Sequence, residues 1–166
     1  AIKLLLKQDG VQVNRASNVG ASPLYVAAER GHTKVVRILL SKSDIDINKA
    51  EKEGCTALFI ASQEGHIEVV RLIVSNSEID INKAKDTGCT ALYIASEEGH
   101  IEVVQLLLSK RDIDINKANN NGVTALFIAA QEGHVDVVSL LLSKSDIDFN
   151  KAKDSGATAL YVASQE

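Results

Sequence analysis

The chain has 166 residues, of which 45% are apolar and 24% charged, and its formal net charge is -4. This composition is typical of one folded domain, and the mildly acidic balance argues against nucleic acid, for which a basic stripe is expected. The apolar runs are too short to span a membrane, and two cysteines do not make a disulfide framework. We therefore expect an intracellular, cytoplasmic protein.

Self-similarity at a fixed period dominates the sequence. Glycines recur at one constant spacing from Gly20 through Gly54 to Gly156, and a Gly-His pair recurs at the same spacing from Gly31-His32 to Gly133-His134. We divide the single domain 1–166 into a partial repeat (1–19), full repeats (20–53, 54–87, 88–121 and 122–155) and a second partial repeat (156–166). Because the first residues already fit the pattern, we expect no signal peptide, and the chain resembles a piece of a longer array.

Each unit predicts the same elements in the same order, beginning in 1–19 with the second half of a unit. In 54–87, Thr56 can cap a short helix that starts at Ala57 and ends at Gly65, where the left-handed conformation suits glycine. A second helix is predicted from about Ile67 to Ser75. It is apolar on most sides, which predicts burial between neighbours rather than a place on a surface. A polar, turn-prone segment then leads to the next unit.

Two short helices and a hairpin-like loop cannot bury enough apolar surface alone. Copies that stack side by side give each helix partners in the neighbouring units. The pattern therefore predicts a solenoid, in which each unit contacts only the units next to it.

The residues of each unit resemble a known repeat. In 54–87 they read Gly-Cys-Thr-Ala-Leu-Phe-Ile-Ala-Ser from Gly54 and Gly-His-Ile-Glu-Val-Val from Gly65. This resembles the ankyrin-repeat pattern G-x-T-P-L-H-x-A-A-x-x-G-H-x-E-V-V, which fits every full repeat. The tetratricopeptide pattern needs Trp, which this chain lacks. The resemblance implies an all-α fold, an ankyrin-type helix-turn-helix solenoid with β-hairpin-like loops.

The units depart from that pattern in ways that affect local geometry. The family's histidine is aromatic here, at Tyr25, Phe59, Tyr93, Phe127 and Tyr161, so packing must hold that junction. The family's usual period is also slightly shorter than the period of this chain. The additional residue falls after the second helix, in 41–46, where the family's glycine is absent. We expect a longer or tighter helix end there.

Residues that could bind a metal or act as nucleophiles recur in separate repeats, so they are not expected to gather in one catalytic site. The histidines from His32 to His134 lie in separate layers, so a structural ring bonded to backbone is favoured over a shared metal ion. Cys55 and Cys89 also lie in separate layers, and free thiols are favoured over a disulfide, with a regulatory thiol as the alternative. No phosphate-binding loop, nucleophile motif or metal motif occurs. We predict no enzyme activity, no cofactor and no metal.

Charged residues form two recurring rows. The first, Glu64, Glu98, Glu132 and Glu166, is either a solvated face or an acidic stripe that faces a basic partner. The second pairs Asp46, Asp80, Asp114 and Asp148 with Lys49, Lys83, Lys117 and Lys151, and predicts ion pairs along the loops.

The resemblance implies that protein partners bind a concave groove formed by hairpin tips and first helices. The matching positions differ among the units more than the apolar framework does. They are Glu29, Arg30, Lys52, Glu53, Cys55, Gln63, Glu64, Asp86, Thr87, Cys89, Glu97, Glu98, Asn120, Asn121, Val123, Gln131, Glu132, Asp154 and Ser155.

The favoured function is a non-catalytic protein–protein interaction scaffold that holds a protein partner, with a basic one preferred. One alternative is a structural spacer or a head-to-tail self-assembling array, joined through the partial terminal repeats. Another is the interaction segment of a larger enzyme or effector. Membrane and nucleic-acid partners are not expected.

Overall fold

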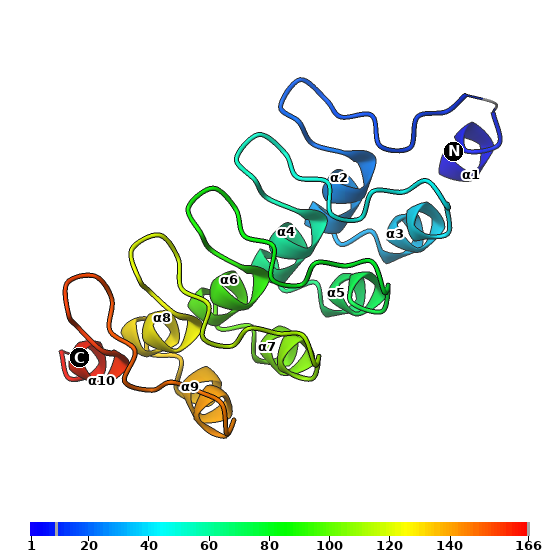
Figure 1. The fold of residues 1–166 in the computed structure, drawn as a ribbon. Coiled ribbons are helices and arrows are strands. Elements are labelled where there is room, and N and C mark those ends of the chain that lie inside the picture. Colours follow the sequence, from blue (N-terminus) through cyan, green and yellow to red (C-terminus); the bar gives the residue numbers. More distant parts are fainter. Residues whose placement is uncertain (9, 166) are drawn as a thin grey trace.

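The computed structural model describes residues 1–8 and 10–165. These residues form helices and no strands, in the order α1 (Ile2–Leu5), α2 (Pro23–Glu29), α3 (Thr33–Leu40), α4 (Ala57–Gln63), α5 (Ile67–Ile73), α6 (Ala91–Glu97), α7 (Ile101–Leu108), α8 (Ala125–Gln131), α9 (Val135–Leu142) and α10 (Ala159–Ala163). The first helices α2, α4, α6, α8 and α10 lie in one row, and the second helices α3, α5, α7 and α9 lie in another (Figure 1). The predicted helix-turn-helix solenoid is confirmed.

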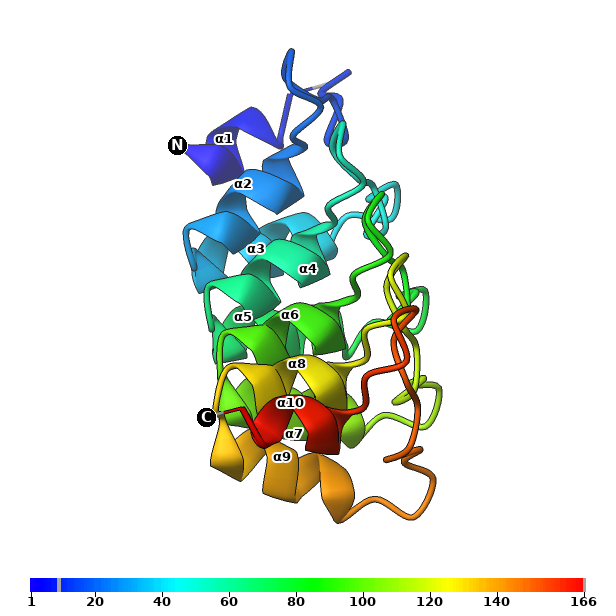
Figure 2. The same ribbon diagram turned by 90° about the vertical axis from the view of Figure 1, so that its left-hand side faces the viewer.

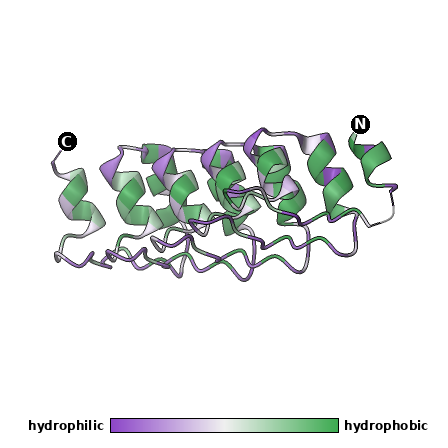
Figure 3. Cartoon of the chain, turned by 90° about the horizontal axis from the view of Figure 1, so that it is seen from above, coloured by the Kyte–Doolittle hydropathy of each residue, from purple (hydrophilic) through white to green (hydrophobic). Residues whose placement is uncertain are grey.

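The loops between helix pairs project to one side of the stack. Turning the molecule by 90° shows the helix pairs as successive layers, with all the long loops along one edge (Figure 2). Hydrophobic residues dominate the helices, whereas hydrophilic residues gather at helix ends and along the loops (Figure 3). The local patterns of the sequence therefore produce an elongated stack rather than a closed core.

Each first helix begins at a side-chain cap, as predicted. The Thr56 hydroxyl accepts a hydrogen bond from the backbone N–H of Phe59, and Ser22 does the same for Tyr25 ahead of Pro23. Such a cap satisfies one of the N–H groups that the helix itself leaves free. Thr90, Thr124 and Thr158 repeat the arrangement.

The first helices α2, α4 and α6 each end at a glycine that two constraints fix. Gly65 has φ +68°, a conformation that side chains with a Cβ rarely adopt. A Cβ at Gly65 would also lie 2.7 Å from Cε1 of His100, whose ring comes from the next layer. The Gly-His pair of one layer thus depends on the glycine of the layer before it.

The first helices, not the second, are the more buried row. Residues 57–62 of α4 are all buried, and α6 and α8 show the same for 91–96 and 125–130. In α5, by contrast, Glu68 and Arg71 are exposed. The prediction that the second helices are buried rather than at a surface is therefore wrong for one side of each helix. Apolar residues on most sides still leave one polar row, and that row faces solvent.

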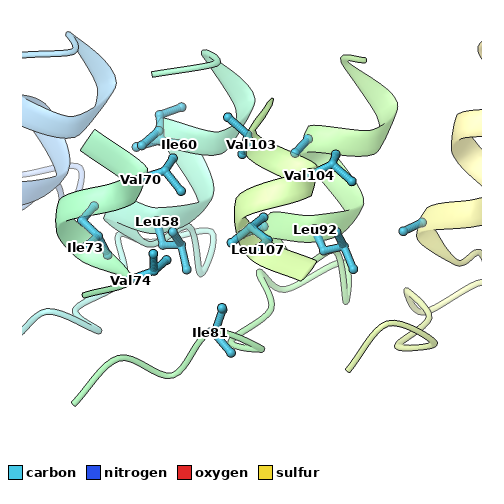
Figure 4. Close-up of a cluster of buried hydrophobic side chains, with 14 of the residues drawn as sticks. Leu58, Ile60, Val70, Ile73, Val74, Ile81, Leu92, Val103, Val104 and Leu107 are labelled. Carbon is cyan, nitrogen blue, oxygen red and sulfur yellow. The ribbon is translucent and has the colours of Figure 1, made fainter. Parts of the chain in front are cut away.

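The core is continuous from layer to layer. Leu58 and Ile73 from one helix pair lie near Leu92 and Leu107 from the next, with Ile81 of the intervening loop below them (Figure 4). Burial of a leucine side chain contributes about 1.5–3 kcal/mol. Because this burial occurs between layers, each unit depends on its neighbours for stability.

The second helices end in a tight turn. In α3 the capping residue Ser41 remains right-handed, and the Lys42 N–H donates to Leu39 O at 3.0 Å. Within the residues that the structure describes, positive φ angles occur only at glycines, and none lies in this turn. The tighter helix end expected for 41–46 is confirmed. The end predicted for α5 at Ser75 was too late, because the helix already ends at Ile73.

Candidate interaction surface

The hairpin tips are held in a row by backbone hydrogen bonds between layers. Asp86 N–H donates to Glu53 O at 3.0 Å, Asn120 N–H to Thr87 O at 2.9 Å, and Asp154 N–H to Asn121 O at 3.1 Å. Within one tip, Glu51 N–H donates to Cys55 O at 3.0 Å. The loops are therefore hairpin-like without forming strands, and their tip side chains stand in register.

The structure places most of the predicted contact residues at exposed positions. The exposed tip residues are Lys52, Glu53, Asp86, Thr87, Asn120, Asn121, Asp154 and Ser155. The exposed residues at first-helix ends are Glu29, Arg30, Glu64, Glu98, Gln131 and Glu132, whereas Gln63 and Glu97 are half-buried. After the tip glycines, Cys89 and Val123 are half-buried and Cys55 is buried. Glu166, the last member of the acidic row, lies outside the described residues.

The histidine rings join adjacent layers. Nε2 of His100 lies 2.9 Å from the Gln63 carbonyl oxygen, and Nε2 of His134 lies 2.8 Å from that of Glu97. Because a carbonyl only accepts, Nε2 carries the proton and donates. The predicted bond from ring to backbone is confirmed for His66, His100 and His134, although the acceptor belongs to the preceding layer rather than to the local turn.

An asparagine ladder on the loop side was not predicted from the sequence. Nδ2 of Asn82 donates to Asp112 O at 2.6 Å, and Oδ1 of Asn82 accepts from the Asp114 N–H at 2.9 Å. One amide thus bridges two backbone groups of the next layer. Asn14, Asn48 and Asn116 make the same pair of bonds. The recurrence of Asn at the repeat spacing was the available signal.

The predicted Asp–Lys ion pairs along the loops are wrong. Asp80 Oδ1 instead accepts from the backbone N–H of Asn82, and Lys83 Nζ donates to Asn48 O of the preceding layer at 2.8 Å. Among the described residues the one ion pair is Glu68–Arg71, at 3.6 Å on the exposed side of α5. The four aspartates bond to the backbone of their own turns, and Lys83, Lys117 and Lys151 bond to carbonyls of the preceding layer.

Lysine side chains from two hairpins lie over aromatic rings of the first helices. Nζ of Lys85 is 5.6 Å from the centroid of the Phe59 ring, and Nζ of Lys153 is 5.2 Å from that of Phe127. These distances allow cation–π attraction. Neither lysine was among the predicted contact residues. The signal in the sequence was a lysine at the same separation after each of these phenylalanines, which predicts contact only once the fold is known.

Glu97 is the most perturbed carboxylate of this surface. Burial raises its pKa, the nearby carboxylates Glu98 and Glu132 raise it further, and Lys85 lowers it. Burial also raises the pKa of the neighbouring Tyr93, and Glu97 adds to that rise. Burial, with the neighbouring carboxylates second, therefore disfavours the charged form of Glu97.

The two cysteines are free and differ in environment. Burial raises the pKa of the Cys55 thiol to about 11; Lys85 opposes the rise, whereas the Glu51 carboxylate adds to it. Cys89 is half-buried and receives a weak hydrogen bond from Asn119 Nδ2, at 3.8 Å from its sulfur. A thiol with a raised pKa is a poor nucleophile at neutral pH, so Cys55 fits packing better than chemistry.

No group of three or more His, Cys, Asp or Glu residues in the described parts of the chain could hold a metal ion. None of the helices seen in residues 1–8 and 10–165 is both long and apolar enough to cross a bilayer.

These features define a helical-repeat solenoid protein. Its helix pairs are stacked, its first helices are capped by Thr or Ser, and its hairpins bond to one another in register. The family model for ankyrin repeats (3 copies) matches residues 1–51, 43–119 and 111–166, which together span the chain. The chain therefore belongs to the ankyrin-repeat family, and the resemblance seen in the sequence is confirmed. No curated protein matches the chain significantly. Ankyrin repeats are generally protein–protein interaction modules.

Proposed function

We propose that this chain is a non-catalytic scaffold that binds a protein partner on its inner face. We define the inner face as the ends of the first helices (Glu29, Arg30, Gln63, Glu64, Glu97, Glu98, Gln131 and Glu132) together with the hairpin residues next to them (Glu51 to Glu53, Lys85 to Thr87, Asn119 to Asn121, and Lys153 to Ser155). The observation that supports the proposal best is a difference between two sets of residues. The framework residues pack against one another or bond to neighbouring layers, whereas most inner-face side chains are exposed.

The partner we favour is basic. Glu64, Glu98 and Glu132 recur at equivalent exposed positions of three adjacent layers. Burial raises the pKa of Glu97, and the neighbouring carboxylates Glu98 and Glu132 add to that rise. A cation from a partner would relieve that repulsion, and charge complementarity also speeds association. The hairpin tips contain neither Trp nor Tyr, which favours polar contacts over aromatic anchors for this partner.

Selection from a random peptide library on the immobilised chain tests this proposal. We expect the selected peptides to be enriched in Lys and Arg, and to lose binding to the triple variant Glu64→Lys, Glu98→Lys, Glu132→Lys. A matched control reverses three exposed acidic residues of the second helices, Glu68, Glu102 and Asp136, which recur at the same spacing. Equal binding to both variants would remove the acidic inner face from consideration.

An exposed apolar surface at α9 and α10 favours a second candidate, head-to-tail association with another copy. Leu142, Phe149 and Leu160 are 49%, 59% and 79% exposed around a cavity of about 350 Å³. Such a contact uses different surfaces on the two copies and can propagate. Sedimentation velocity over a wide concentration range would reveal growing species, whereas monomer at every concentration would end this candidate.

A further inference from the structure

The apolar surface at α9 and α10 (Leu142, Phe149 and Leu160), which we call the tail surface, exposes positions that the inner layers bury. Leu160 is 79% exposed, whereas the leucines at the same position of the preceding layers are at most 3% exposed: Leu24, Leu58, Leu92 and Leu126. Phe149 is exposed as well, whereas its equivalents are buried: Ile47, Ile81 and Ile115. In every full repeat the first helix packs against the second helix of its own layer, as α8 does against α9. The tail surface therefore has the chemistry of a surface that a second helix covers.

The opposite end of the stack, which we call the head surface, consists of α1 and a hollow beside α2. Helix α1 lies at the end of the row of second helices, and α10 lies at the far end of the row of first helices (Figure 1). Leu5 of α1 is 62% exposed, whereas its equivalents in the other second helices are at most 1% exposed: Leu39, Ile73, Leu107 and Leu141. Helix α1 therefore exposes a position that the other second helices bury.

The hollow beside α2 has a volume of about 540 Å³, and most of its lining is apolar, including Pro23, Val26 and Val35. Val26 is exposed there, whereas its equivalents are buried: Ile60, Ile94 and Ile128. Ile94 packs with Phe59 of the layer before it, and each first helix from α4 onward packs against the first helix of the preceding layer. The head surface therefore offers a place for a first helix next to α1, and α10 is a first helix.

The two ends also differ in charge. Residues 1–53 contain more basic than acidic side chains, whereas each later full repeat contains more acidic than basic ones. Exposed basic residues near the head include Lys3, Lys7, Lys34 and Arg37, and exposed acidic residues near the tail include Asp136, Asp146, Asp148 and Asp154. Within about a Debye length, this distribution attracts a head to a tail and repels two heads or two tails.

We propose that the tail surface of one copy binds the head surface of another, so that α10 of the first copy and α1 of the second become the first and second helix of one shared layer. This inference rests on head-to-tail association, the second candidate above, and specifies its contact. Residues 156–166 align with 54–64 of a full repeat, and residues 1–19 align with 69–87. The two segments occupy different parts of the repeat, so each copy supplies a part that the other does not.

The asparagine ladder determines the register of this contact. Asn116 binds two backbone groups of the next layer, the carbonyl of Asp146 and the N–H of Asp148. Asn150 holds the next position of the ladder, and within residues 1–8 and 10–165 its amide makes neither bond. In the shared layer the equivalent backbone groups are the Gly10 carbonyl and the Gln12 N–H of the second copy. The proposed contact therefore extends the ladder by one step.

Two complementary variants test the proposal by sedimentation velocity. Leu160→Glu blocks the tail surface and Leu5→Glu blocks the head surface, and both side chains are exposed, so neither substitution places a charge in the core. The unmodified chain should form species that grow with concentration, whereas each variant alone should remain a monomer. An equimolar mixture should form a dimer and nothing larger, because one open tail meets one open head. Val26→Glu is a second head variant, and circular dichroism checks that each variant folds.

Val19→Glu is the matched control. Val19 is an exposed tip residue of the first layer, and its equivalent in the next layer is Glu53, which is also exposed. This control should associate like the unmodified chain. Asn150→Ala tests the register, because the loss of two hydrogen bonds should weaken association about thirtyfold. Asn121→Ala, at an exposed tip away from the contact, should leave association unchanged.

The proposal is overturned if either variant associates alone, since the contact then uses another surface. It is also overturned if the mixture remains monomeric, or if the unmodified chain is a monomer at every concentration. If the unmodified chain grows but the mixture does not stop at a dimer, head-to-tail association stands and this contact fails. The peptide library on the inner face is a separate measurement, so none of these results decides whether the chain binds a protein partner there.

Discussion

The asparagine ladder predicts that Asn82→Ala weakens the contact between two layers. Its amide makes two hydrogen bonds to the next layer, to Asp112 O at 2.6 Å and from the Asp114 N–H at 2.9 Å. A hydrogen bond contributes about 1 kcal/mol net, so the substitution should lower the free energy of unfolding by about 2 kcal/mol. For a chain of this length that corresponds to a fall in Tm of about 4–8 °C.

Urea denaturation followed by far-ultraviolet circular dichroism measures this loss. Asn121→Ala is the matched control, because Asn121 is an exposed tip residue and only its backbone is bonded to the next layer. The control should change the unfolding free energy by less than about 0.5 kcal/mol. Asn82→Asp keeps the acceptor for Asp114 N–H but loses the donor to Asp112 O, so it should be intermediate. If Asn82→Ala and Asn121→Ala are equally stable, the ladder does not hold the layers together.

Three further predictions concern single residues. Gly99→Ala should lower the free energy of unfolding by about 2–3 kcal/mol, because φ is +72° and the new Cβ would lie 2.7 Å from the His134 ring. Gly156 has a similar φ but open space around it, so Gly156→Ala should lower that free energy by about 1 kcal/mol less in the same urea titration. Iodoacetamide at pH 8 should alkylate Cys89 well before Cys55, whose pKa is raised to about 11, and mass spectrometry of digested protein would contradict this if Cys55 reacts first. Glu97→Gln should raise Tm at neutral pH, because a carboxyl whose pKa is raised by folding destabilises the folded state once it is ionised. The gain should vanish as the pH falls below the pKa of the unfolded state, about 4.3. A gain in Tm that persists at pH 3 would refute this origin.

The local features of each unit could be predicted from the sequence because they depend on residues close together in the chain. Thr56 caps the helix that starts beside it, and Gly65 takes the left-handed conformation that ends that helix. The fold class followed from the fixed period, since short amphipathic helices must stack to bury their apolar sides. The exposure of most tip and helix-end side chains could also be predicted, because these side chains are polar and lie outside the apolar pattern of the helices.

The contacts between layers were decided by the tertiary structure. The asparagine ladder joins residues 30 and 32 apart, the lysine–carbonyl bonds residues 35 apart, and the histidine bonds residues 37 apart. A residue type that recurs in every unit does not show which neighbour it contacts, so Asp80 and Lys83 predicted an ion pair although each binds backbone. The position of Lys85 over Phe59 was hidden for the same reason. Periodicity determined that layers repeat, and only their packing in space determined which side chains meet across them.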